Sequence, residues 1–233
     1  MIGVKPLCGL ARTVLVMLCV YIFVLACNTL TGLYELIEFA NYKADFVPAR
    51  FLISQIVSGW VALVFLLVYL LTAIFFLKWI YRANKNLQLL GDGRMEFSAT
   101  AAVVWYFVPI ANLFKPYQAM RDIWKKAHQA WHADSRLLPG WWTLWIISIL
   151  IGQIVARQHS VTIGEYRLAA ITTIVSHLLN MALGFSAIAL ISNITRAYEK
   201  NYCGAEGAEP DILDALKINT RPSDIVENLP GSE

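Results

Sequence analysis

The sequence predicts an all-α integral membrane protein with four transmembrane helices, one short proline-broken re-entrant segment and an interfacial amphipathic helix. Two observations predict this class. Of 233 residues, 58% are hydrophobic and only 15% are charged, whereas soluble domains carry roughly 45–50% apolar and about 25% charged residues. The apolar residues also fall in blocks, and the block Trp60–Leu77 contains no charged residue.

The first two blocks predict spans over residues 13–31 and 58–80, because a bilayer core needs about 20 apolar residues. Cys27 lies in a sequence that loosely resembles a lipoprotein cleavage box. The length of the apolar run favours an uncleaved anchor over a lipidated Cys27. The second helix is expected to continue beyond the membrane, with Trp79, Arg82 and Asn86 at helical spacing, until the glycine-rich stretch 91–93 ends it.

The segment 99–114 is apolar but short, and Pro109 interrupts it. Ser98 is placed to cap its start. Proline inside a helix removes a backbone hydrogen bond and clashes with the preceding turn, so we expect a break between Val108 and Asn112. The segment is therefore predicted to be re-entrant, and a short fifth span is the alternative.

Residues 116–132 predict a helix that lies in the membrane interface. Tyr117, Met120, Trp124 and Ala127 fall on one apolar stripe, while the other faces carry Arg121, Lys125 and Lys126. Such a pattern is typical of an amphipathic helix at a lipid surface. His128 and His132 share a face of this helix, but they lack the further ligands of a metal site, so no metal is predicted.

The last two spans are predicted over residues 140–156 and 168–192. Trp141 and Trp142 open the first of them and indicate an aromatic anchor at the membrane surface. The same helix carries Ser148, Gly152 and Ala156 four residues apart, a small-residue stripe that lets helices approach closely.

The final span carries polar side chains at membrane depth, His177 and Asn180, which mark either a functional path or interhelical hydrogen bonds. From residue 199 to 233 the chain is polar and acidic, and it is predicted to be a disordered tail. Two apolar triplets in it, Ile212-Leu213-Leu216 and Ile225-Val226-Leu229, are candidates for docking to a protein partner.

The distribution of positive charge predicts the topology, because basic residues collect on the cytoplasmic side. Residues 78–94 contain four basic residues and residues 115–136 contain five, whereas the loops 35–50 and 157–167 contain two each. A re-entrant 99–114 segment puts every basic-rich loop on one side. Both termini of the membrane domain 1–198 are then cytoplasmic, and so is the tail.

Several local motifs together resemble a bacterial membrane protein family known as domain of unknown function 4328. The likeness rests on Trp79-Ile80-Tyr81-Arg82-Ala83 with Asn86, on Trp105-Tyr106-Phe107-Val108-Pro109-Ile110-Ala111-Asn112-Leu113, on Pro116-Tyr117-Gln118-Ala119-Met120 with Trp124, and on Trp141-Trp142 with Trp145. The resemblance implies a bacterial cytoplasmic membrane protein, and it implies no assigned activity.

No catalytic residue and no cofactor are predicted, since the sequence contains no nucleophile elbow, P-loop or dinucleotide fingerprint. The net charge of +3 does not indicate nucleic-acid binding. We expect a non-enzymatic membrane scaffold or regulatory module that presents its cytoplasmic face to partners. The alternative is a small oligomeric transporter or channel subunit with a site around Pro109–Asn112.

The expected partners follow from the same features. They are the lipid bilayer, with anionic phospholipid headgroups near Arg82 and Asn86, a protein that binds the tail, and a second copy of the chain.

Overall fold

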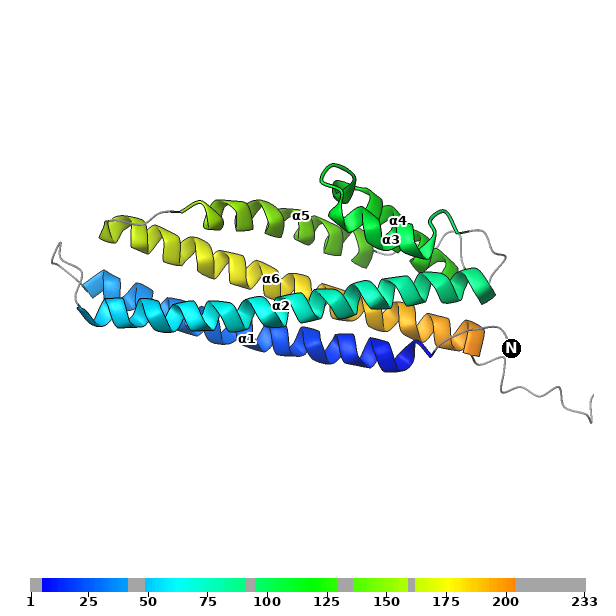
Figure 1. The fold of residues 1–233 in the computed structure, drawn as a ribbon, viewed down its shortest axis with the longest axis horizontal. Coiled ribbons are helices and arrows are strands. Elements are labelled where there is room, and N and C mark those ends of the chain that lie inside the picture. Colours follow the sequence, from blue (N-terminus) through cyan, green and yellow to red (C-terminus); the bar gives the residue numbers. More distant parts are fainter. Residues whose placement is uncertain (1–5, 42–48, 91–94, 130–135, 159–161, 204–233) are drawn as a thin grey trace, which may run out of the picture.

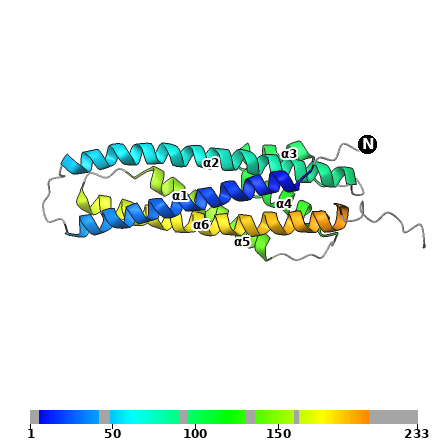
Figure 2. The same cartoon turned by 90° about the horizontal axis from the view of Figure 1, so that it is seen from below.

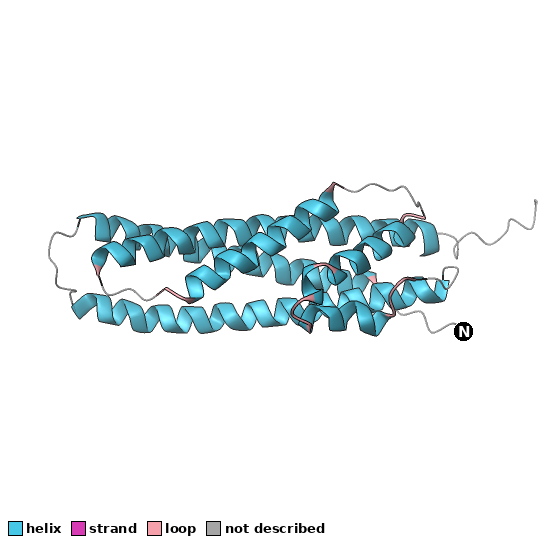
Figure 3. Cartoon of the chain, turned by 90° about the horizontal axis from the view of Figure 1, so that it is seen from above, coloured by secondary structure: helices cyan, strands magenta, loops and turns pink. Residues whose placement is uncertain are grey.

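The computed structural model describes residues 6–41, 49–90, 95–129, 136–158 and 162–203. Within these ranges every regular element is helical (Figure 3). The elements are α1 (Cys8–Asn41), α2 (Ala49–Leu90), α3 (Ala99–Val104), the 3-10 helices η1 (Trp105–Phe107) and η2 (Ala111–Leu113), α4 (Lys115–Ala127), α5 (Leu137–Ala156), α6 (Ile163–Tyr198) and the π-helical turn η3 (Glu199–Cys203).

The long helices form a row rather than a closed bundle. α1 packs along both α6 and α2, and α6 packs along α5, as Figures 1 and 2 show. The row order is therefore α2–α1–α6–α5. The hairpin formed by α3, η1, η2 and α4 lies beside α2 and also contacts α5 and α6, so it joins the two edges of the row at one end.

Four helices of the described chain are long and apolar enough to cross a membrane: α1, α2, α5 and α6. They include the four spans that the sequence predicts, and each is longer than its predicted span. α2 runs for 42 residues, which is about 63 Å at 1.5 Å per residue, or twice the hydrocarbon thickness. The four helices indicate a multi-pass membrane protein.

The predicted start of the 99–114 segment is confirmed, and the chain leaves the helical conformation at Val108, where the predicted break begins. The Ser98 side chain accepts a hydrogen bond from the Ala101 backbone N–H at 3.2 Å and caps α3. α3 ends at Val104 and tightens into the 3-10 helix η1, which was not predicted, and the backbone is extended at Val108. At six residues, α3 is too short to span a bilayer.

The predicted amphipathic helix is shorter at its carboxyl end than residues 116–132. α4 ends at Ala127, and Gln129 has a φ of 50°, a left-handed conformation that does not continue a helix. His132 lies outside the described residues. α4 begins at Lys115 with Pro116 in its first turn, where the missing backbone N–H of proline is not needed.

The buried core of the molecule gathers at one end, which we call the hairpin end. It comprises the start of α1, the last turns of α2 from Trp79, the α3–α4 hairpin, the first turns of α5 and the last turns of α6 with η3. The remainder of the row buries few side chains: only 6% of the most apolar stretch of α2 is buried. Apolar side chains in that remainder face outward, as suits a helix surrounded by lipid.

Candidate functional site

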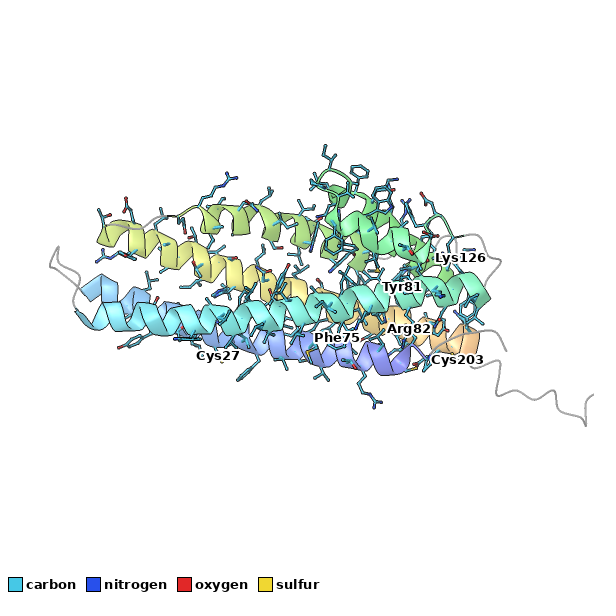
Figure 4. All side chains as sticks on the ribbon, viewed as in Figure 1. Cys27, Phe75, Tyr81, Arg82, Lys126 and Cys203 are labelled. Carbon is cyan, nitrogen blue, oxygen red and sulfur yellow. The ribbon has the colours of Figure 1, made fainter. Side chains whose placement is uncertain are left out.

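The structure brings most of the sequence-predicted site residues to the hairpin end. Trp79, Arg82 and Asn86 come from α2, Trp105, Pro109 and Asn112 from the hairpin, Pro116, Tyr117 and Trp124 from α4, and Trp141 and Trp142 from α5. His177 and Asn180 lie on α6, near the middle of its length and away from the hairpin end. Figure 4 places Arg82, Lys126 and Cys203 at this end and Cys27 away from it.

Two of the α2 residues form the interior of this end rather than its surface. Trp79 is fully buried and Asn86 is 2% exposed. The Asn86 amide Nδ2 donates to the Tyr198 hydroxyl of α6 at 3.2 Å. This hydrogen bond joins α2 to α6. A lipid headgroup cannot reach a side chain that is enclosed in protein, so Asn86 does not form a lipid site with Arg82. The Arg82 guanidinium donates to the Pro6 carbonyl at 3.1 Å.

An aromatic cluster links α2, the hairpin and α5. Phe76 is its centre: the ring centroids of Trp79, Tyr106 and Trp141 lie 6.3, 6.4 and 6.2 Å from that of Phe76. Aromatic pairs at such distances add to the stabilisation from burial alone. The two predicted anchors, Trp141 and Trp142, are therefore partly structural, since Trp141 is 3% exposed.

The break around Pro109 forms a tight turn at the tip of the hairpin. The Asn112 N–H donates to the Val108 carbonyl at 2.7 Å. The Trp142 indole N–H of α5 donates to the Leu113 carbonyl at 3.2 Å and ties the tip to α5. The apolar side chains at the tip point outward, with Phe107 70% and Ile110 76% exposed. A fixed turn thus presents bare apolar side chains away from the bundle.

The bundle covers the apolar stripe predicted on α4, which was expected to face the membrane interface. Met120, Ile123 and Ala127 are at most 1% exposed, and Trp124 is 8% exposed. Because α4 packs on α2, α5 and α6, these apolar side chains contact other helices of the protein. The faces that remain open carry the basic residues, and Arg121 is exposed.

Polar contacts hold the connection between α2 and the hairpin. The Gln88 amide Nε2 donates to Asn84 Oδ1 at 2.7 Å and to the Phe97 carbonyl at 3.0 Å. The Asp122 carboxylate accepts a hydrogen bond from the Glu96 N–H at 2.8 Å. Burial raises the pKa of the Asp122 carboxyl above its ordinary value, and this hydrogen bond opposes the rise.

The last turn of the described chain docks onto the end of α4. Asn201 Nδ2 donates to the Ala127 carbonyl at 2.9 Å, and the Tyr202 hydroxyl donates to the Lys126 carbonyl at 3.0 Å. The first bond gives a partner to a carbonyl of the last turn of α4, and the second is shared with the Gln129 N–H, which also donates to the Lys126 carbonyl at 3.2 Å. The tail was predicted to begin at Glu199, whereas the ordered contacts continue through Tyr202.

The predicted intramembrane residues lie at the junction of α1, α2 and α6. The Tyr21 hydroxyl donates to Asn180 Oδ1 at 3.4 Å, and the His177 ring lies 6.4 Å from that of Phe65. A Cβ added at Gly184 would meet Cγ1 of Ile22 at 2.9 Å, so α1 and α6 cross closely there. A Cβ added at Gly152, in the predicted small-residue stripe of α5, would meet no atom within 4 Å.

The described residues contain no set of three His, Cys, Asp or Glu side chains that could hold a metal ion. Instead, the hairpin end contains buried polar atoms without a hydrogen-bond partner: the indole N–H groups of Trp79, Trp105 and Trp124, the Tyr106 hydroxyl, Asn84 Nδ2 and Asn112 Oδ1. Most of these groups are neutral donors on aromatic rings. They suit hydrogen bonding, and they supply no acid–base pair or nucleophile for catalysis.

Comparison with known proteins identifies the relatives of this chain. A model of the family described as domain of unknown function (DUF4328) matches residues 43–196. The chain belongs to this family. No curated protein and no solved structure matches it. The matched region contains α2, the hairpin, α5 and α6 as far as Arg196, so it covers the hairpin together with three of the four long helices.

Sequence reasoning missed the partners that complete this end. Tyr198, Asn201 and Tyr202 were assigned to the end of a span or to the tail, and Asn84 and Gln88 were not singled out. One signal was present: an amide side chain stands at every second position from Asn84 to Gln88, beyond the apolar block of the same helix.

Proposed function

We propose that this protein is a non-enzymatic scaffold or regulatory module of the bacterial cytoplasmic membrane, which presents its hairpin end to partners in the cytoplasm. One observation carries the proposal: the motifs that resemble the family build a packed head at one end of the spans. Their buried side chains pack and donate hydrogen bonds between helices, and they supply no catalytic group. A head of this kind is suited to holding a surface in a fixed position.

The orientation follows from charge. The hairpin end holds the basic residues of α4 together with Arg82, Lys85 and Arg196, whereas Arg157 and Arg167 lie at the opposite end. Because positive residues stay in the cytoplasm, the hairpin end is cytoplasmic in this proposal. The amino terminus and residues 204–233 then lie on the same side.

The hairpin acts in this proposal as a shallow re-entrant wedge. Trp142, whose indole N–H donates to the Leu113 carbonyl, lies in the second turn of α5. It is about 8 Å from the start of that helix, at 1.5 Å per residue, so the tip of the hairpin lies at about this depth along α5. One half of the hydrocarbon core is about 15 Å thick. If α5 enters the bilayer at its first turn, the exposed Phe107 and Ile110 side chains reach one leaflet only. They anchor the head at the membrane surface, and the basic faces of α4 stay in water.

The transporter alternative receives less support from this geometry. Its site would lie at Pro109–Asn112, and Ile110 within that stretch is 76% exposed on the outside of the row. Transport sites at broken helices are enclosed by neighbouring helices near the middle of the bilayer. A flux assay in liposomes separates the two functions: the scaffold predicts no conductance for ions or small solutes above that of empty liposomes.

Deletion of residues 204–233 tests the scaffold directly. The deletion leaves Asn201 and Tyr202 on α4, so insertion and folding should be retained while a phenotype of the null strain appears. Full function in a strain that lacks residues 204–233 would remove the tail from the proposal. A conductance in the flux assay would replace the scaffold by the transporter.

A further inference from the structure

Two of the four cysteines come together at the hairpin end. The thiol of Cys8, the first residue of α1, donates a hydrogen bond to the Glu199 carboxylate of η3, which is 191 residues away in sequence. The same thiol interacts electrostatically with that of Cys203, the last residue of η3. Both cysteine side chains are exposed, so small reagents in water can reach them.

The spacing of Glu199 and Cys203 shows how near the two thiols are. These residues are four apart in η3. Residues at this spacing lie on the same side of this part of the chain, because the rings of Tyr198 and Tyr202, also four apart, stack with their centroids at 5.7 Å. The Cys8 thiol, which sits on the Glu199 carboxylate, is therefore about one helical turn from the Cys203 side chain. Rotation of the Cys8 side chain away from Glu199, with a small shift of η3, joins the two sulfurs.

Both partners of this pair are held in place by the fold. Just before Cys8, the Pro6 carbonyl accepts the Arg82 guanidinium at 3.1 Å, and Leu7 is 1% exposed in the core. On the other side, Tyr198 is buried in the same core, and η3 donates two hydrogen bonds to the last turn of α4. The two cysteines are therefore kept near each other by packing that does not involve sulfur.

The other two cysteines stand apart from this pair. Cys19 and Cys27 are exposed on the same continuous helix as Cys8. They lie eleven and nineteen residues further along α1, which is about 17 and about 29 Å at 1.5 Å per residue. Figure 4 places Cys27 well away from Cys203. Cys19 and Cys27 therefore serve as internal controls for the reactivity of the pair.

We propose that Cys8 and Cys203 form a reversible disulfide, made by peroxides and broken by small thiols, that ties α1 to η3. The disulfide replaces the hydrogen bond from Cys8 to Glu199 and releases that carboxylate. It also holds the start of residues 204–233 on the hairpin end by a covalent bond. This proposal concerns a modification site, and it does not depend on the scaffold function.

The chemistry consumes one peroxide for each disulfide. The thiolate of one cysteine attacks a peroxide oxygen, the O–O bond breaks, and a sulfenic acid and water are formed. The thiol of the other cysteine then attacks the sulfenic sulfur, the S–S bond forms, and the hydroxyl leaves as a second water with the proton of that thiol. Two small thiols reverse the step by exchange through a mixed disulfide and are themselves oxidised to a disulfide.

The proposed topology makes the disulfide a response to oxidants. If the hairpin end is cytoplasmic, small thiols keep both cysteines reduced in unstressed cells. Peroxide then drives the pair to the disulfide until the cell reduces it again. The pair should therefore be reduced in growing cells and oxidised after a brief exposure to hydrogen peroxide.

Thiol counting and peptide mapping test the pair in the full-length protein. The wild type is purified in maltoside, treated with hydrogen peroxide, denatured and tagged with a maleimide polymer. We expect the number of tagged thiols to fall from four to the two of Cys19 and Cys27. After proteolysis, mass spectrometry should find the Cys8 and Cys203 peptides linked and lighter by their two thiol hydrogens. At micromolar protein, this bond should form about a thousandfold faster than a cross-link between chains, because contact within a chain acts at millimolar effective concentration.

Three variants assign the reaction to this geometry. C8S and C203S should each form no disulfide within the chain. K200C/C203S moves the second thiol to an exposed position off the Glu199 side of η3 and should close more slowly than the wild type. Thermal unfolding gives a second readout: the oxidised wild type should unfold at a higher temperature than the reduced protein, and C203S should show no such difference.

Several results would overturn the proposal. They are four tagged thiols after oxidation, a linked peptide that contains Cys19 or Cys27, and closure of K200C/C203S as fast as that of the wild type. In cells, a pair that is already fully oxidised without peroxide would overturn its reversibility. A cysteine at position 125 tests the side of the membrane separately, so failure of the topology can be distinguished from failure of the pair.

Discussion

The hairpin end and the part of α2 before it both carry large apolar side chains, and these have opposite surroundings. Trp79 is fully buried, whereas Trp60, nineteen residues earlier on the same helix, is 68% exposed. In water an apolar side chain gains free energy only by meeting protein. In a bilayer, contact with lipid chains is about as favourable for an apolar side chain as contact with protein, so helices there need to bury few side chains against each other. In the proposed topology, the packed core lies where the helices leave the membrane.

The largest effect should come from truncating the core of the hairpin end. Trp79→Ala removes the side chain that stacks on Phe76 and should cost about 3–5 kcal/mol of stability. Trp60→Ala removes the same side chain from a site exposed in the structure and should cost less than about 0.5 kcal/mol. Thermal unfolding of both variants in maltoside micelles measures the difference. Equal losses would break the distinction between the two regions.

The close crossing of α1 and α6 should give the next largest effect. Gly184→Ala brings a methyl group to 2.9 Å from Ile22 Cγ1, and the forced shift should destabilise the protein by about 1–3 kcal/mol. Gly152→Ala on α5 meets no atom within 4 Å and should be neutral or stabilising by up to about 1 kcal/mol. The same unfolding measurement compares them. A tolerated Gly184→Ala would show that α1 and α6 are held less tightly than the structure indicates.

Removing one hydrogen bond from each region should give a smaller difference in stability. Tyr198→Phe removes the acceptor for Asn86 in the protein core and should cost about 1–2 kcal/mol. Tyr21→Phe removes the 3.4 Å hydrogen bond to Asn180 and should cost about 0.6 kcal/mol, the average within membranes. A larger loss for Tyr21→Phe would reassign the main polar junction to the spans.

The smallest effect should be the pH dependence at Asp122. Its pKa is raised in the folded state, so folding favours the protonated form, and this stabilisation is lost as the pH rises through the folded pKa. Asp122→Asn keeps an acceptor for the Glu96 N–H and carries no charge. The variant should therefore gain stability relative to the wild type as the pH rises from acidic to neutral. A gap that is constant with pH would contradict the assigned cause.

The sequence was sufficient for the membrane class, the four long apolar helices, the cap at Ser98 and the presence of a break near Pro109. These features depend on the chain itself: apolar length, capping chemistry and the missing N–H of proline. The sequence was insufficient where the partner of an apolar side chain decides the structure. The stripe of Met120, Trp124 and Ala127 fits a lipid surface and a protein surface equally well, and only the fold shows that protein covers it.

The same limit applies to individual residues of the candidate site. Arg82 and Asn86 beside Trp79 suggested a headgroup site, because Tyr198, the hydrogen-bond partner of Asn86 on α6, is 112 residues away in sequence. Gly152 and Gly184 look alike in a helical pattern, and only the position of Ile22 distinguishes them. Long-range packing of this kind leaves no local signal.

The central claim, a cytoplasmic hairpin end with a re-entrant segment 99–114, is tested most directly by thiol accessibility. In a background without native cysteines, a single cysteine replaces Lys125 at the hairpin end or Arg157 at the opposite end, and intact and lysed cells are treated with a membrane-impermeant thiol reagent. We predict that the cysteine at position 125 is labelled only after lysis and that at position 157 in intact cells. Labelling of position 125 in intact cells would contradict the topology and the proposed function with it.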